Sequence, residues 1–156
     1  MKLSSFETKA YQWMAKNGIL LLRISIGIVF FWFGIQKFFP GLSSAEDLAS
    51  RTIESMSFGL VGPKVSMPIL ATWEVLIGLT FMFRYLMRIA VPLLFLQMIG
   101  TVMPLLLFPA DTFVPPPLVP TLIGQYIIKN IVIVTGAMVV GAYYKGLIKT
   151  SKIKEQ

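Results

Sequence analysis

Four long apolar stretches constrain this chain more than any other feature. They run over residues 18–39, 67–83, 89–108 and 122–144. A helix needs about 20 largely apolar residues to cross the hydrocarbon core of a bilayer, so each stretch can form one span. The second is short, and we expect it to extend at its outer end or to lie where the bilayer thins. The sequence therefore predicts an all-α membrane protein, a bundle of four transmembrane helices.

Composition supports a single integral membrane domain covering residues 1–156. Hydrophobic residues make up 56% of the chain and charged residues only 13%, whereas soluble domains carry about 25% charged residues. The chain has no cysteine and no histidine, which excludes thiol chemistry, iron–sulfur clusters, standard zinc sites and haem ligated by these residues. We therefore expect no metal site. A redox role would need an organic carrier, with a quinone as the candidate, or the cofactor of a partner subunit.

The distribution of charge predicts how the chain is oriented in the membrane. A formal net charge of +7 could suggest nucleic acid, but the basic residues flank the spans, so we expect a lipid bilayer and no nucleic-acid partner. One side of the membrane receives Lys2, Lys9, Lys16, Arg84, Arg88, Lys145, Lys149, Lys152 and Lys154. On the other side, Arg51 and Lys64 are accompanied by acidic residues. By the positive-inside rule, both termini are expected in the cytoplasm.

The segments outside the spans carry weaker signals. Residues 45–58 could form a short helix on the bilayer surface or an irregular loop. Residues 109–120 contain a proline run that favours extended polyproline geometry, either as a stiff cap over the outer mouth of the bundle or as a plain connector. Near the N-terminus, Ser4 and Glu7 fit a capping box, which predicts an interfacial helix from Ser4 to Ala15.

Three charged residues lie inside stretches that are otherwise almost wholly apolar: Lys37, Glu74 and Lys129. A charge at membrane depth costs about 2.5–3.5 kcal/mol on insertion scales, and such residues usually pair and mark a site. At a rise of about 1.5 Å per residue, Glu74 and Lys129 each lie roughly 10 Å from the outer start of their spans. Lys37 lies near the outer end of the first span. We therefore expect Glu74 to lie within direct or one-water reach of Lys37 or Lys129.

Other polar residues accompany these three, which lie in the outer half of the bundle, and together they define a candidate ligand-binding set. The set consists of Lys37, Glu74, Lys129, Gln36, Gln125, Gln97, Asn130 and Arg23. Glu74 is also the candidate for proton transfer. Plainer interpretations stand beside these roles. Lys37 could snorkel to the outer interface and Arg23 to the inner one, and Glu74 with Lys129 could be an ion pair that only fixes helix register.

Three segments carry a resemblance to a known family. They read LRISIGIVFFWFGIQKFFPG in the first span, WEVLIGLTFMFRYLMRIA around the inner turn and PTLIGQYIIKNIVIVTGAM in the fourth span. The chain resembles the DoxX-like family of small four-helix membrane proteins over most of its length. In that family the polar positions correspond to Arg23, Lys37, Glu74 and Lys129. Some relatives are subunits of thiosulfate:quinone oxidoreductases and others are linked to oxidant resistance, so the resemblance implies a bacterial or archaeal inner-membrane protein. The lack of cysteine departs from any thiol-based role.

Three functions follow as hypotheses, and the sequence leaves open whether the chain is an enzyme. The first is a redox- or oxidative-stress-associated subunit whose polar pocket binds a quinone or another small ligand. The second is a transporter or channel for a small anion or a proton-coupled solute. The third is a non-enzymatic scaffold for a partner. The few polar groups in the inner half favour a one-sided site over a continuous path. A redox partner subunit and a homo-oligomer are both compatible with the pattern.

The predicted orientation can be tested by labelling introduced cysteines, because the chain has none of its own. A cysteine at Ser44 or Thr112 should react with a membrane-impermeant reagent added to intact cells. A cysteine at Ser151 should react only after the membrane is opened. Labelling at Ser151 in intact cells would contradict the orientation.

Overall fold

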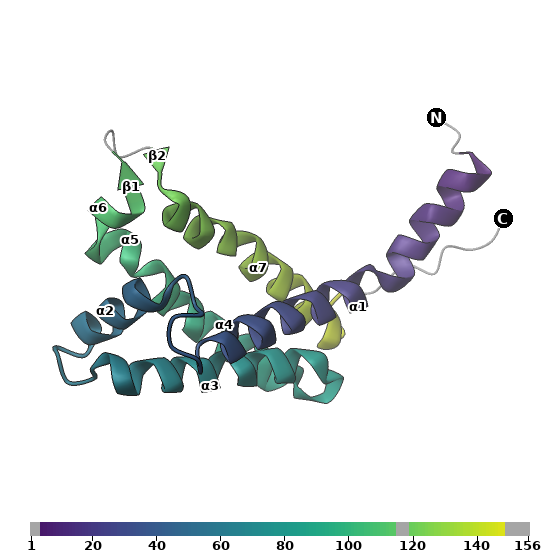
Figure 1. Cartoon of the computed structure of the whole chain (residues 1–156). Helices are drawn as coiled ribbons and strands as arrows, with labels where there is room; N and C mark the ends of the chain where they lie inside the picture. The colour runs from purple at the N-terminus through teal and green to yellow at the C-terminus, as the bar shows by residue number, and fades with distance from the viewer. Residues whose placement is uncertain (1–3, 115–118, 149–156) are drawn as a thin grey trace.

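A computed structural model describes residues 4–114 and 119–148 and shows a helical protein (Figure 1). The expectations placed on Lys2, on residues 115–118 and on everything beyond Ile148 lie outside this described part. Four helices are long and apolar enough to cross a membrane. They are built from α1 (Ser5–Gln36), α3 (Pro63–Met82), α4 (Met87–Val102) and α7 (Leu122–Tyr144). The prediction of an all-α protein with four membrane spans is confirmed.

The helix ends differ from the predicted spans in two places. The capping box is present, since the Ser4 hydroxyl accepts from the Glu7 N–H and the Glu7 carboxylate accepts from the Ser4 N–H. The helix predicted to start there is present, but it continues without a break to Gln36, so it is not separate from the first span. The second span begins at Pro63, which suits the first turn of a helix because its missing N–H needs no partner there. This extension supplies the length that the apolar stretch lacked.

The link between α1 and α3 contains a helix, α2 (Glu46–Met56), so of the two alternatives the irregular loop is excluded. Leu48, Ser50 and Thr52 of α2 are buried, and α2 lies against α3. The helix is therefore part of the packed structure at this end of the bundle. We call this end of the bundle the α2 end. We call the opposite end, where η1 (Arg84–Leu86) joins α3 to α4, the η1 end.

In its described part the link before α7 contains helical turns and a short pair of strands. After α4 the chain forms two single helical turns, α5 (Pro104–Leu107) and α6 (Pro109–Thr112). The short strands β1 (Phe113–Val114) and β2 (Val119–Pro120) then pair antiparallel. Each helical turn starts with proline at its first position, where proline favours a helix. The prolines of residues 115–117 lie outside the described residues.

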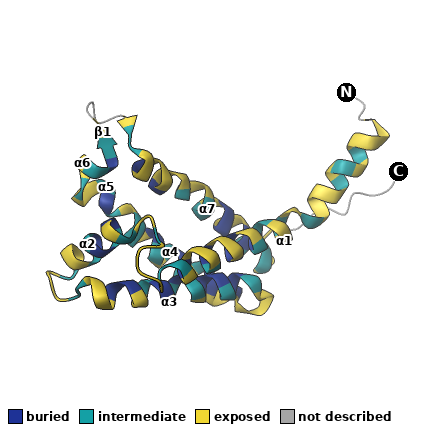
Figure 2. Ribbon diagram, in the orientation of Figure 1, coloured by how far each residue is buried: buried dark blue, intermediate teal, exposed yellow. Residues whose placement is uncertain are grey.

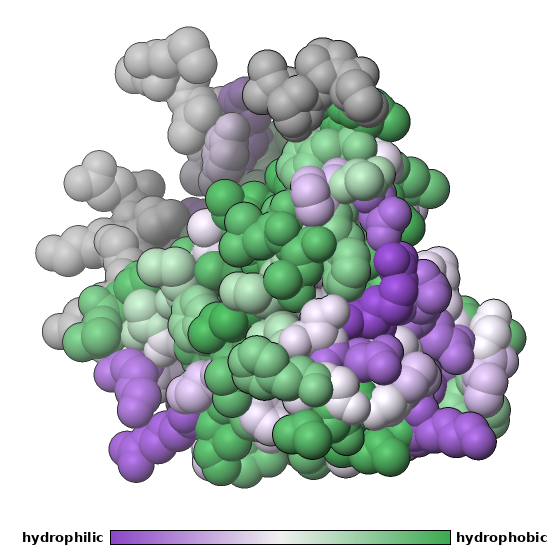
Figure 3. Space-filling view, turned by 90° about the vertical axis from the view of Figure 1, so that its left-hand side faces the viewer, coloured by the Kyte–Doolittle hydropathy of each residue, from purple (hydrophilic) through white to green (hydrophobic). Residues whose placement is uncertain are grey.

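A polar contact joins α2 to α6 at the α2 end. The Arg51 guanidinium donates to Asp111 at 2.8 Å and to Asp47 at 2.9 Å, and it lies 4.9 Å from the Phe108 ring centroid. The hydrogen bond to Asp111 raises the pKa of Arg51 above its ordinary value. Figure 3 looks onto this end and shows hydrophilic residues beside extensive hydrophobic surface. Thr112 is fully buried, so Ser44, which is exposed, is the usable outer labelling position.

The closest helix packing is between α1 and α3, and glycines make it possible. A Cβ placed on Gly78 of α3 would lie 2.5 Å from the Phe31 backbone nitrogen of α1. A Cβ on Gly34 of α1 would lie 2.8 Å from the Val75 nitrogen. Small residues on a helix face let two backbones approach in a membrane. These contacts define a glycine seam along the α1–α3 interface, made of Gly27, Gly34 and Gly78.

The apolar core lies between α1, α3 and α4, with the C-terminal half of α7 (Figure 2). Its fully buried members are Ala71, Ile77, Phe81, Ala90, Leu94, Ala137 and Val140. Along α7, Gly136 faces Leu22 of α1 and Gly141 faces Val91 of α4. The N-terminal half of α7 leans away from α1 and α3 (Figure 1). As a result α7 is the least buried of the four spans.

A substitution in the glycine seam should therefore be costly. Gly78→Ala should destabilise the protein by about 1–3 kcal/mol, because the added methyl group forces the α1 backbone to move. Gly100→Ala in α4 is the matched control, since nothing lies within 4 Å of a Cβ there. It should be neutral or stabilising by up to about 1 kcal/mol. Unfolding in a detergent titration measures both, and equal effects of the two substitutions would contradict the packing.

Candidate functional site: a buried ion pair between three helices

Lys37, Glu74 and Gln97 meet near the α2 end of the bundle, and we call them the polar cluster. Lys37 is the C-cap of α1, Glu74 lies in α3 and Gln97 in α4. The Lys37 ammonium lies 2.6 Å from Glu74 Oε2. The Gln97 side-chain amide donates to Glu74 Oε1 at 3.1 Å. A single carboxylate thus joins three membrane-spanning helices.

The glycine seam brings these side chains together. A Cβ on Gly34 would lie 3.0 Å from the Glu74 Cβ, so α1 passes directly over the Glu74 side chain. Lys37 follows Gly34 by three residues and shares its helix face. On the other side of α3, the Trp73 indole N–H donates to the Leu93 carbonyl of α4 at 3.3 Å. This contact positions α4 so that Gln97, one turn further along, reaches Glu74.

The polar cluster is a buried, charge-neutral contact. The Lys37 and Glu74 side chains are only 9% and 10% exposed. Burying either charge alone would carry a large desolvation penalty, and the partner offsets it only with good geometry and satisfied lone pairs. Both Glu74 oxygens have a donor. The expectation that Lys37 snorkels to the outer interface is therefore wrong, because its ammonium is held inside the bundle.

The cluster retains some hydrogen-bonding capacity. An ammonium group has three donors, and the second contact of Lys37 is a long bond to the Phe33 carbonyl at 3.4 Å. In the described part of the chain no donor contacts the Gln97 side-chain oxygen. A carbonyl or hydroxyl oxygen placed here could accept from Lys37, and a hydroxyl group could also donate to the Gln97 side-chain oxygen. The cluster can thus recognise a small polar group without losing its ion pair.

Lys129 does not belong to the polar cluster. It lies on an exposed face of α7, with its ammonium 5.0 Å from the Tyr126 ring centroid. The expected contact between Glu74 and a lysine is present, but with Lys37. Pairing of Glu74 with Lys129 was the wrong alternative, because α7 leans away at this level. On the same helix Gln125 is exposed and Asn130 is half-buried.

Gln36 and Arg23 are also separate from the cluster. Gln36 is half-buried beside Lys37, and its side chain makes no hydrogen bond within residues 4–114 and 119–148. Arg23 lies at the η1 end, where it donates to the Phe81 and Met82 carbonyls, both at 2.9 Å. It is only 5% exposed. The expectation that Arg23 snorkels to the inner interface is wrong, because it satisfies carbonyls at the end of α3 instead.

Apolar residues separate the polar cluster from Arg23. On α1 the buried positions between Arg23 and Gly34 are Ile26, Gly27 and Phe30. On α3, Ile77 and Phe81 are fully buried, as is Leu94 on α4. The Thr80 hydroxyl in this region donates to carbonyls of its own helix. The buried polar groups at the two ends are thus divided by a dry core.

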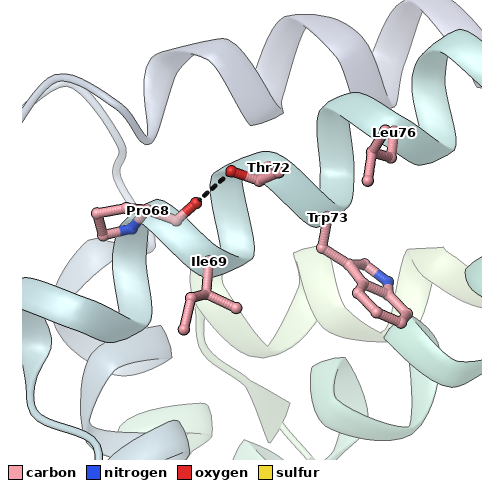
Figure 4. A pocket seen from close by; sticks show the side chains of 5 residues that line it. All are labelled: Pro68, Ile69, Thr72, Trp73 and Leu76. Atoms are coloured by element: carbon pink, nitrogen blue, oxygen red, sulfur yellow. Dashed lines mark hydrogen bonds between the residues drawn. The ribbon is translucent and has the colours of Figure 1, made fainter.

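Two hollows of the surface lie apart from the residues of the polar cluster. One is an apolar groove along α3, lined by Pro68, Ile69, Thr72, Trp73 and Leu76 (Figure 4). Its hydroxyl, from Thr72, already donates to the Pro68 carbonyl, so the groove suits lipid acyl chains. The other is polar and lies at the α2 end, lined by Gly41, Ser43, Ser44, Glu46, Asp47, Ser50 and Pro63. Within the described residues no group of three or more potential metal-ligating side chains occurs.

Sequence reasoning missed the partner of Arg23, which is Tyr144. The Arg23 guanidinium carbon lies 5.3 Å from the Tyr144 ring centroid, and that of Arg84 lies 5.8 Å from the same centroid. An available signal was the position of Tyr144 at the end of the last span, where tyrosines gather at the membrane interface. The basic residues near this end of the span were interpreted only as evidence for the orientation of the chain in the membrane.

These features define a small four-span membrane protein with an ion pair buried between its first three spans. The DoxX family model matches residues 18–108 of the chain. The match covers more than half of the 156 residues, and the chain belongs to the DoxX family. All three residues of the polar cluster lie within the matched segment, whereas Lys129 and α7 lie outside it. No match was found among curated proteins or among solved structures.

A double-mutant cycle tests whether the buried pair is energetically coupled. Lys37→Met or Glu74→Gln alone should lower the free energy of unfolding by about 3–5 kcal/mol, because either change leaves the remaining charge buried without its counter-charge. The double variant should cost less than the sum. Arg51→Gln with Asp111→Asn is the control pair. Both of its side chains are about 40% exposed, so the coupling energy between them should stay below about 1 kcal/mol. Additive effects at Lys37 and Glu74 would mean that the ion pair does not form.

Proposed function

We propose that this DoxX family member is a redox- or oxidative-stress-associated membrane subunit that binds a quinone head group, or a similar small carbonyl ligand, beside the polar cluster. The observation that carries the proposal is the buried Lys37–Glu74–Gln97 contact with spare hydrogen-bonding capacity at one end of an otherwise apolar bundle. The relatives linked to quinone oxidoreductases and oxidant resistance agree with it. A site of this kind needs neither cysteine nor histidine.

The contacts of Lys37 support recognition of a carbonyl oxygen. A ring carbonyl could replace the long bond from Lys37 to the Phe33 carbonyl, and a hydrogen bond from an ammonium is among the stronger protein contacts. Phe33, Phe38 and Phe39 are exposed around Lys37. They offer flat apolar surface for a ring and a route for its tail into lipid. The side-chain oxygen of Gln97 would accept a hydrogen bond from the hydroxyl of the reduced ligand.

Proton balance defines the role proposed for Glu74. A bound quinone supplies two-electron chemistry, in which its reduction to a quinol takes up two protons. The electrons would come from a redox partner subunit. Glu74 would pass the protons, received from water at the α2 end, and Lys37 would stabilise its carboxylate after each transfer. Gln97 would hold the carboxylate in position throughout.

Transport by a single chain is less well supported. A pathway for an anion or a proton needs polar groups from one side of the membrane to the other. Here Ile77, Phe81 and Leu94 fill the interior between the polar cluster and Arg23 with fully buried apolar side chains. This dry core favours a site open to one side. We further propose that the α2 end faces outward and that both termini lie in the cytoplasm of a bacterial or archaeal cell.

A scaffold role remains the second candidate, and Lys129 favours it. Lys129 is exposed on the least buried span, where contact with lipid chains is unfavourable for a charge. A partner subunit with a carboxylate at matching depth would compensate that charge. A homo-oligomer through this face would bring like charges together, because the acidic residues of the described chain lie on other elements.

Titration of the purified protein with a quinone analogue tests the proposed function. Lys37→Met should weaken binding by about tenfold or more, since one charge-assisted hydrogen bond is worth about 1.5–3 kcal/mol. Lys129→Met removes the same side chain from the exposed face of α7 and should leave binding unchanged. Circular dichroism shows whether both variants keep their fold.

An ion-flux assay in liposomes provides the comparison with transport. Binding of the analogue without flux is the expected result. A flux that depends on Glu74, together with no binding of the analogue, would favour the transporter. Absence of both, with the fold intact, would favour the scaffold.

A further inference from the structure

A second group of charged and aromatic residues lies at the η1 end, far from the polar cluster. It consists of Arg23 of α1, Arg84 of η1 and Tyr144 at the end of α7. Both guanidinium groups lie within 6 Å of the Tyr144 ring centroid, at 5.3 Å for Arg23 and 5.8 Å for Arg84. The Tyr143 ring meets the Tyr144 ring edge-on at 5.3 Å. Three membrane spans therefore converge on one basic, aromatic corner, the Arg–Tyr corner.

The positive charge of this corner has no carboxylate partner in the described part of the chain. The ion pairs among the described residues involve Lys37 and Arg51, and both residues are remote from the corner. Arg23 donates to the Phe81 and Met82 carbonyls. These carbonyls carry a partial negative charge at the end of α3, which offsets only part of the positive charge of the guanidinium. Arg84 is exposed. Two full positive charges thus share one tyrosine ring and lack a full counter-charge.

One atom of the corner also lacks a hydrogen-bond partner. Arg23 Nε is buried without an acceptor, and Arg23 as a whole is 5% exposed. Buried donors in native proteins are nearly always satisfied, so an exception calls for a missing partner. The buried Arg23 guanidinium therefore keeps an unmatched donor beside its positive charge.

We propose that the Arg–Tyr corner binds the phosphate of an anionic phospholipid. Arginine suits phosphate because its planar donors match two phosphate oxygens. Basic pockets between membrane helices are a recurring site for anionic lipid head groups. The surroundings match a lipid, since Phe83 and Leu147 are exposed apolar residues near the corner. Arg84 donates to the phosphate, Tyr144 orients both guanidinium groups, and Arg23 adds its charge from within the bundle.

The site is independent of the proposed quinone site. The dry core separates the two, and the lipid proposal holds whether or not the polar cluster binds a ligand. Its role would be to join the middle of α1, at Arg23, to the C-terminal ends of α3 and α7. This matters most for α7, which leans away from the bundle at its other end (Figure 1).

Lipid binding to the full-length protein in neutral detergent tests the proposal. Native mass spectrometry should show retention of phosphatidylglycerol over phosphatidylcholine with identical acyl chains. Arg84→Gln should reduce that preference at least fivefold, and because Arg84 is exposed the variant should still fold. Arg51→Gln, at the α2 end, is the matched control and should keep the preference. Thermal unfolding with each lipid should show a larger stabilisation by phosphatidylglycerol, lost in Arg84→Gln.

The remaining outcomes decide against the proposal. Equal retention of the two lipids would overturn it, as would an unchanged preference in Arg84→Gln. Inorganic phosphate is titrated separately to distinguish the lipid from a free anion. Stabilisation by phosphate alone, with no preference between the lipids, would assign the corner to a soluble anion and overturn the lipid assignment.

Discussion

The close approach of α1 to α3 is the contact on which the other features depend. At Gly78 the two backbones leave no room for a methyl group. This approach places Lys37 directly beside Glu74, and it also brings Arg23 to the Phe81 and Met82 carbonyls. A polar contact therefore holds the interface at each end, with apolar packing between. Since a buried ion pair stabilises only when its geometry is good, the glycine seam and the pair require one another.

The sequence predicts well how deep a residue lies along its membrane span. It predicts poorly which residue of a neighbouring helix lies beside it. Apolar length located the four spans, and the rise per residue placed Glu74 at the depth of a lysine. Depth could not tell Lys37 from Lys129, because that choice depends on the lean of α7, which is set by contacts such as Gly136 with Leu22 and Gly141 with Val91. The acceptors of Arg23 could not be predicted either, since they are backbone carbonyls on another helix. The two helical turns before α7 were not predicted, although Pro104 and Pro109 stand at their first positions, where proline favours a helix.

The two ends of the bundle suggest different tasks. Near the α2 end a neutral, buried polar cluster has spare hydrogen-bonding capacity, which supports binding of a small carbonyl ligand. At the η1 end two arginines share Tyr144 without a full counter-charge, which supports binding of an anion at the membrane surface. The apolar core between them argues for separate sites. Exposed Lys129 adds a third feature, a charge on the least buried of the four spans.

The most direct test of this account is the distance between the Lys37 ammonium and the Glu74 carboxylate in the bilayer. Solid-state NMR on protein with ¹⁵N-labelled lysine and ¹³C-labelled glutamate reports nitrogen–carboxylate contacts. In the described residues the ion pair of Lys37 with Glu74, at 2.6 Å, is the one lysine–glutamate contact. The account predicts one strongly coupled pair that disappears in Glu74→Gln. No such coupling, or a coupling that survives Glu74→Gln and disappears instead in Lys129→Met, would contradict it.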